Sequence, residues 1–270
     1  MRRFAANAWI GSALVGGFVA IALLALVWTP ADPLALNLRA RFRPPGGAFP
    51  LGSDEFGRDV LSRAMAGAAT SLWIAASSVA LALALGVAMG LLAGFARGVA
   101  DRLLMVANDA LLAFPGILLA LAVMVVAGAS PASLVLALGL AYAPSVVRVV
   151  RGVVLSLRER EFVEASRVIG NGAAYTVLRH VLPNCIAPVA VLATSMLGFV
   201  LLSESALSFL GLGVPPPAPT WGNMLAAARP HLLSAPWLGL VPGICIALTL
   251  LGFNLLGDAL RDWLDPRMES

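Results

Sequence analysis

The chain has 270 residues, of which 60% are hydrophobic and only 12% are charged. A soluble domain carries about 25% charged residues, so we exclude an ordinary soluble fold and expect a chain that covers its backbone inside a bilayer. The net charge of +4 does not indicate nucleic acid, because all 18 basic residues are arginines scattered between apolar blocks. A bias of arginine toward cytosolic loops explains this distribution better.

Apolar stretches in chain order predict an all-α integral membrane protein. Each is close to the length of about 20 residues that a spanning helix needs. The first follows Arg2 and Arg3 and resembles a signal peptide, but it is too long for one and no small-x-small cleavage site follows, so we expect a retained helix. The six predicted transmembrane helices lie in segments 9–29, 69–95, 103–127, 132–150, 185–210 and 237–257.

Arginine counts predict the orientation. With a cytosolic N-terminus, twelve arginines fall on the inner side and six on the outer side. This bias favours both termini in the cytosol. Segments 30–68 and 211–236 then lie outside, and the long loop 151–184 lies inside.

The second predicted helix carries a ridge of small residues. Gly86, Gly90 and Gly94 recur every four residues, which lets a neighbouring helix approach closely. We interpret the ridge as a packing seam without chemistry.

The sequence of the inner loop predicts two helices joined by a kink. Gly170-Asn171-Gly172 interrupts a helical pattern, since glycine adopts the left-handed geometry that ends helices. We expect Asn171 to cap the second helix and Pro183 to end that helix at the membrane. The first helix gathers apolar residues on one face, namely Phe162, Ala165, Ile169 and Ala173.

The two helices and the kink in loop 151–184 form an elbow. This elbow could contact either the lipid surface or a soluble protein. Helices that lie on lipid are rich in basic residues on their polar face. Here Glu159, Glu161 and Glu164 are mixed with the arginines, which favours a protein partner.

The elbow resembles the EAA signature of binding-protein-dependent ABC importer permeases. Glu164-Ala165-Ser166, a glycine at Gly170 and the closing Leu182-Pro183 match it at its spacing. Ser166 departs from the usual alanine, and His180 stands where an aliphatic residue is usual. The resemblance implies a coupling helix that docks into a groove of an ATPase subunit, with Glu164 in a polar contact and Gly170 at the turn.

Further segments resemble the second of the two paralogous permease subunits that import dipeptides, oligopeptides or nickel. They are Leu-Gly-Ser-Asp-Glu-Phe-Gly-Arg-Asp-Val-Leu-Ser-Arg at 51–63, Asp-Ala-Leu-Leu-Ala-Phe-Pro at 109–115, Leu-Ser-Phe-Leu-Gly-Leu-Gly at 207–213 with Trp-Gly-Asn at 221–223, and Leu-Asp-Pro-Arg at 264–267. Val106 departs, because an arginine after the methionine is common there. The resemblance implies a type I ABC importer permease fold in the bacterial inner membrane, which we divide into an N-terminal helix with an outer segment (1–68) and a five-helix core (69–270).

Two groups of charges are candidates for contact with the transported solute. Glu204, beside Ser203, lies toward the outer end of the fifth helix, where it either borders the translocation path or organises the loop 211–236. Asp54, Arg58 and Asp59 either form an outer gate or a binding-protein contact, or pair with one another around a turn. We expect Asp109 to be structural.

A transport subunit without catalysis is the function that these features predict. The chain has no phosphate-binding loop, and His180 and His231 have no zinc or Ser/His arrangement. We expect no metal and no cofactor here, with ATP and Mg bound by partners. The resemblance implies a paralogous permease, two ATPase subunits or domains, an extracytoplasmic solute-binding protein and the surrounding lipid.

Peptides are the solute we expect, with nickel or glutathione-like solutes as the alternative. An ion-coupled secondary transporter would show an inverted repeat and charged sites near the membrane midplane, and neither is visible. An intramembrane enzyme would need a catalytic constellation, and none is present. ATPase activity that depends on co-expressed partners would separate the three classes.

Overall fold

The structure is a computed structural model that describes residues 2–96 and 98–264, and the described part is helical with no strand. The long helices are α1 (Arg2–Ala25), α2 (Val60–Ala96), α5 (Pro131–Leu157), α8 (Leu182–Phe209) and α10 (Trp237–Leu264). Between them lie η1 (Leu38–Ala40), α3 (Gly98–Leu112), α4 (Gly116–Ala127), α6 (Glu161–Val168), α7 (Ala173–Thr176), η2 (Val177–Val181), α9 (Trp221–Ala228) and η3 (Arg229–His231).

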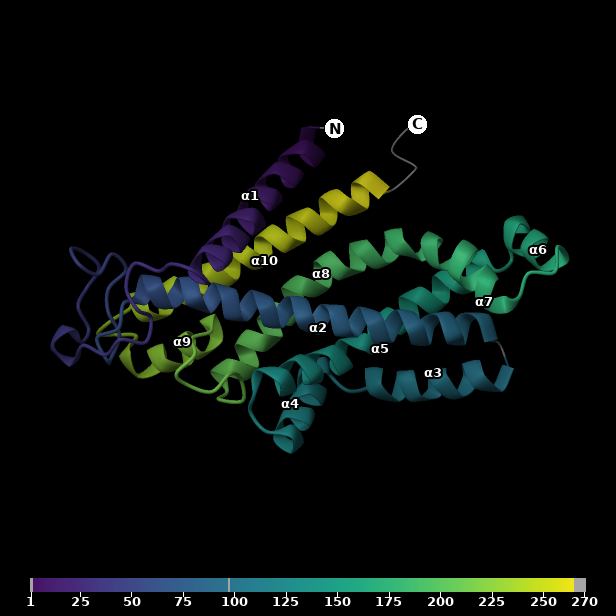
Figure 1. Cartoon of the computed structure of the whole chain (residues 1–270). Helices are drawn as coiled ribbons and strands as arrows, with labels where there is room; N and C mark the ends of the chain where they lie inside the picture. The colour runs from purple at the N-terminus through teal and green to yellow at the C-terminus, as the bar shows by residue number, and fades with distance from the viewer. Residues whose placement is uncertain (1, 97, 265–270) are drawn as a thin grey trace.

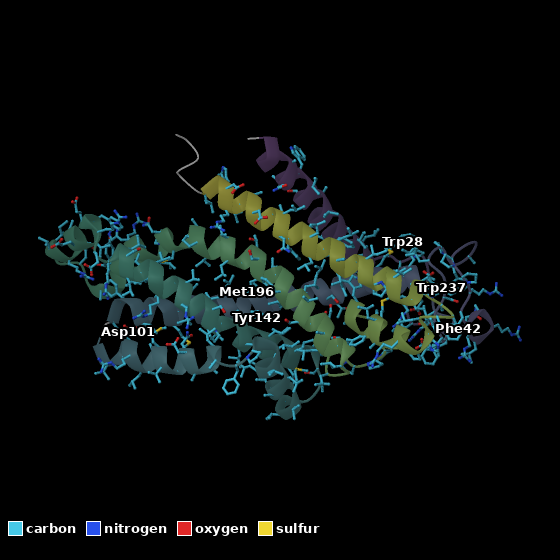
Figure 2. All side chains as sticks on the ribbon, turned by 180° about the vertical axis from the view of Figure 1, so that it is seen from behind. Trp28, Phe42, Asp101, Tyr142, Met196 and Trp237 are labelled. Atoms are coloured by element: carbon cyan, nitrogen blue, oxygen red, sulfur yellow. The ribbon has the colours of Figure 1, made fainter. Side chains whose placement is uncertain are left out.

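The helices form an elongated bundle with a distinct structure at each end (Figure 1). α2 and α5 run side by side through its centre, and α1 packs along α10. The elbow of α6 and α7 lies at one end, and segment 30–59 lies with α9 at the other. Figure 2 shows the same division, with Trp28, Phe42 and Trp237 gathered at the end opposite Asp101.

The glycine ridge is the contact between α2 and α5. A Cβ built on Gly90 would lie 2.7 Å from Cβ of Val150, and one built on Gly94 would lie 2.7 Å from Cβ of Val154. Gly86 faces Val146 more closely still. Because the facing residues keep one offset along both helices, α2 and α5 run parallel, and the absence of side chains on the ridge lets their backbones approach.

Within the residues that the structure describes, five helical spans are unbroken and one is bent. The predicted third helix, 103–127, is wrong as a straight helix, because α3 and α4 meet at an angle of 91°. Pro115 is the N-cap of α4, with φ −55° and ψ 128°. Proline disfavours helical geometry in the residue before it, so the chain turns at Phe114–Pro115, and the bent pair counts as the sixth span.

Two other predicted limits are corrected. Asp59 caps α2, since its Oδ2 accepts hydrogen bonds from the backbone N–H and the hydroxyl of Ser62 at 2.8 and 2.6 Å. α2 therefore begins at Val60, and our division at residue 68 falls inside a helix. Pro183 does not end a helix, because it occupies the first turn of α8, where a missing N–H is tolerated. α7, the π-helical turn η2 and α8 form one span from Ala173 to Phe209.

The end opposite the elbow is closed by a buried tryptophan. Trp221 is fully buried, and its indole N–H donates to the carbonyl of Ala64 at 3.0 Å. Its ring meets Phe18 of α1 edge to face at 5.5 Å. Trp221 thus joins α9 to α1 and α2, which fixes the segment after α8 onto the bundle.

Candidate functional site

The elbow joins the end of α5 to the start of α8. α6 ends at Val168, and a Schellman motif follows. The N–H of Gly170 donates to the carbonyl of Arg167 at 3.0 Å, and the N–H of Asn171 donates to the carbonyl of Ser166 at 3.1 Å. Gly170 has φ +93°, and a Cβ built on it would meet nothing within 4 Å. The turn therefore requires glycine for its backbone geometry and not for space.

A buried hydroxyl pair holds the two arms of the elbow together. Ser166 Oγ lies 3.0 Å from Thr176 Oγ1, across the turn on α7. Asn171 Nδ2 donates to the same Ser166 Oγ at 3.2 Å. The prediction that Asn171 caps α7 is wrong, since Gly172 is the N-cap and makes no side-chain bond. Ser166, the departure from the family's alanine, is thus the residue that pins α6 to α7.

The outer face of the elbow is apolar. Val163 and Ser166 of α6 are buried against the protein, whereas Phe162, Val168 and Ile169 are 42%, 81% and 79% exposed. Glu164 and Ala165 are exposed on the same short helix. Within residues 2–96 and 98–264, the Glu164 carboxylate has no ion-pair partner. A projecting surface that combines large apolar side chains with an unpaired carboxylate is typical of a protein contact.

The elbow is tied to the membrane helices on both sides. Arg158 Nη1 donates to the carbonyl of Gly94 at 2.9 Å, and the Arg167 guanidinium lies 5.0 Å from the centre of the Phe95 ring. Both contacts reach the last turn of α2. Leu182 is half-buried and Pro183 is exposed where the second arm enters α8. The elbow is therefore bonded to the end of α2 and leads directly into α8.

His180, the second departure, packs inside the elbow. The centre of its ring lies 5.9 Å from the centre of the Tyr175 ring and 6.5 Å from that of the Phe162 ring. The imidazole thus bridges both arms by ring contacts, in place of the aliphatic side chain that is usual there.

The charged turn before α2 is paired internally. Asp54 accepts hydrogen bonds from the backbone N–H of Arg58 at 2.9 Å and from its guanidinium at 2.6 Å. Arg63 Nε lies 3.5 Å from the same carboxylate. Asp54 and Arg58 pair with each other before α2, and Asp59 caps that helix, so these charges brace its start.

Glu204 joins three helices. Its carboxylate is fully buried and accepts hydrogen bonds from the hydroxyls of Ser208 at 2.8 Å and Ser205 at 3.3 Å. The hydroxyls of Ser71 on α2 and of Thr220, the cap of α9, lie near the same carboxylate. This geometry supports the organising role rather than a place on the path. Its neighbour Ser203 lies 2.7 Å from the Tyr142 hydroxyl of α5 and so joins α8 to α5.

Asp109 forms an ion pair that sequence reasoning missed. Arg148 Nη2 lies 2.8 Å from Asp109 Oδ1, and one turn along α5 Arg151 binds Asp101 through two hydrogen bonds of 2.6 and 2.8 Å. Val106, where an arginine is common, is exposed on α3. Of the predicted motif 264–267, only Leu264 lies within the described residues.

Comparison with known proteins identifies the family. The model of the binding-protein-dependent transport system inner membrane component matches residues 86–270. The chain belongs to this family. As a permease, it is 43% identical over 96% of its length to a putative peptide transport system permease protein of Brucella suis, of which 88% is covered.

Two further relatives extend the comparison. The permease is 40% identical to the dipeptide transport system permease protein of Alkalihalophilus pseudofirmus, over 97% of this chain and 86% of that one. It is 44% identical to the glutathione transport system permease protein of Escherichia coli, over 81% and 72% of the two chains.

A solved structure supports the fold. An inward-facing structure of the MetNI methionine ABC transporter matches with a TM-score of 0.58 at 20% identity, covering 74% of this permease and 95% of that chain. The predicted all-α, multi-pass permease of the type I importer fold is confirmed, as is its place in the inner membrane.

Proposed function

We propose that this permease forms, with a paralogous subunit, the translocation path for di- and oligopeptides, and that its elbow couples the path to ATPase subunits. The observation that carries the proposal is the exposed apolar face of the elbow at Phe162, Val168 and Ile169. Large apolar side chains exposed together on a projecting element mark a contact surface for a partner. The same elbow is bonded to the end of α2 through Arg158 and Arg167, so a partner that moves it also moves the membrane helices.

A groove on an ATPase subunit is the partner surface that best fits the exposed face of the elbow. Large apolar side chains fill such a groove, and the Glu164 carboxylate supplies a charged contact at its rim. ATP and Mg would be bound by those subunits, and an extracytoplasmic binding protein would deliver the solute to the opposite end. No covalent chemistry is assigned to this chain.

Peptides are the solute class that the relatives favour, since the Brucella and Alkalihalophilus permeases carry peptide and dipeptide in their names. Glutathione is the second candidate, because the Escherichia coli relative is a glutathione permease. Glutathione is itself a short peptide with free carboxylates and an amine, so one path suits both solutes.

Uptake in a defined host tests this function. A strain without its own peptide importers would express the permease with its paralogous subunit, ATPases and binding protein, and uptake of labelled dipeptide and of glutathione would be measured. We expect uptake only with the complete set. An ATPase partner whose phosphate-loop lysine is replaced serves as the control. Uptake that persists without active ATPases would identify an ion-coupled transporter instead.

A further inference from the structure

The face of α5 that turns away from α2 is polar. Its buried face carries Val146, Val150 and Val154 against the glycine ridge. The opposite face is a stripe at steps of three and four residues, half-buried at its first member and exposed at the others: Ser145, Arg148, Gly152 and Ser156. A helix whose outer face meets lipid shows the reverse pattern.

Two ion pairs connect α5 to α3, and the first includes Arg148 of this stripe. The Arg148–Asp109 pair is open, with side chains 61% and 55% exposed. The Arg151–Asp101 pair lies closer to the elbow and is 27% and 18% exposed. Figure 2 shows Asp101 toward the elbow end of the molecule and Tyr142, one turn before Ser145, near its middle.

The open pair lies along the membrane helices and away from their ends at the elbow. At a rise of 1.5 Å per residue, Arg148 is roughly 14 Å from the Leu157 end of α5 and Asp109 is roughly 16 Å from the Gly98 end of α3. Exposed charges on membrane-spanning helices are costly against lipid and normally face protein or water.

Other helices present apolar side chains outward. Leu92 of α2 and Ile186 of α8 are both 62% exposed, and Ile244 of α10 is 53% exposed. These faces suit lipid. Arg148 has five N–H donors, of which its bond to Asp109 uses one. The unused donors and acceptors of the pair require water or a polar occupant, which an apolar neighbour cannot supply.

We propose that the α3–α5 face with the Arg148–Asp109 pair is a wall of the aqueous translocation path, and that the pair binds the carboxylate and ammonium ends of a peptide in transit. One positive and one negative group, both open to solvent, complement a zwitterionic solute. The contact with peptide rests on the proposed function, whereas the aqueous wall follows from the exposure of the ion pair on membrane-spanning helices.

Thiol labelling tests the wall by itself. Ser145→Cys, in the assembled importer with Cys185→Ala and Cys245→Ala, is treated in inside-out vesicles with a charged, membrane-impermeant methanethiosulfonate. Leu92→Cys is the matched control on the opposite face. We expect labelling at position 145 and none at position 92. An unlabelled position 145 would mean that lipid or the partner permease seals this face, and the proposal would be overturned.

Neutralising the pair tests the contact with solute. Removing both partners of a merely structural pair is close to neutral, so the double variant Asp109→Asn, Arg148→Gln would then keep its uptake. If the charges bind peptide, we expect peptide uptake to fall about tenfold or more, the loss expected for hydrogen bonds to charged groups. Co-purification of the partner subunits verifies assembly, and Arg102→Gln on α3 controls for the loss of an arginine. Full uptake by the double variant would refute solute binding, whereas absent uptake by the unaltered permease would refute the proposed function instead.

Discussion

The seam between α2 and α5 gives a graded prediction. In Gly90→Ala the new methyl group would lie 2.7 Å from Cβ of Val150 and 3.0 Å from the carbonyl oxygen of Val147. Ordinary carbon contacts are about 3.5–4.0 Å, so the two helices must separate by roughly 1 Å. Overpacking of this kind costs about 1–3 kcal/mol.

Helix propensity opposes this cost. Replacing glycine by alanine inside a helix favours folding by about 1 kcal/mol. Gly152→Ala on α5 isolates that gain, since a Cβ at Gly152 meets nothing within 4 Å. The difference between the two variants is therefore the cost of the seam, about 1–3 kcal/mol.

Unfolding of the detergent-purified permease by a denaturing detergent measures both variants. We expect Gly90→Ala and Gly94→Ala to be less stable than Gly152→Ala, and Gly86→Ala to be the least stable, because Gly86 lies closest to α5. Equal stability of Gly90→Ala and Gly152→Ala would refute the close approach of α2 and α5.

Two other predictions follow from the elbow and from the buried carboxylate. Gly170→Ala adds a side chain at φ +93° and should cost about 1–2 kcal/mol, lowering peptide-stimulated ATP hydrolysis by the assembled importer. Gly172→Ala, at φ −65° and equally open, should not do so, and equal effects would refute a role of backbone geometry. Glu204→Gln keeps a hydrogen-bond acceptor and the shape of the side chain, so it should retain most uptake of neutral and cationic peptides alike. Glu204→Leu leaves the surrounding hydroxyls without an acceptor and should lose about 1–3 kcal/mol of stability. If Glu204→Gln changed the preference for neutral over cationic peptides, Glu204 would border the translocation path.

Local sequence patterns were enough to predict the membrane spans, the glycine ridge of α2 and the turn at Gly170. A hydrophobic run of about 20 residues, glycines every four residues and a glycine at a helix end each depend on neighbours in sequence. The bend at Pro115 had a local signal too, but the apolar run across it concealed the break.

Contacts between distant segments could not be predicted in this way. Ser166 bonds to Thr176 only because the turn at Gly170 folds α7 back onto α6. The Asp109–Arg148 pair joins residues 39 positions apart on different helices. The hydroxyls gathered around Glu204 come from α2, α8 and the cap of α9. Each contact depends on how helices pack, which hydrophobic periodicity does not specify.

The measurement that tests the coupling elbow most directly is the retention of ATPase subunits by Ile169→Asp. Ile169 is 79% exposed at the tip of α6, and Val99, 71% exposed at the start of α3, provides Val99→Asp as a control at the same end of the molecule. Burying an unpaired carboxylate in an apolar groove costs several kcal/mol, which corresponds to more than about a tenfold loss of affinity. We predict that Ile169→Asp reaches the membrane at normal abundance, loses the ATPase on purification and loses peptide-stimulated ATP hydrolysis, while Val99→Asp keeps both. Full ATPase retention by Ile169→Asp would contradict the coupling role of the elbow.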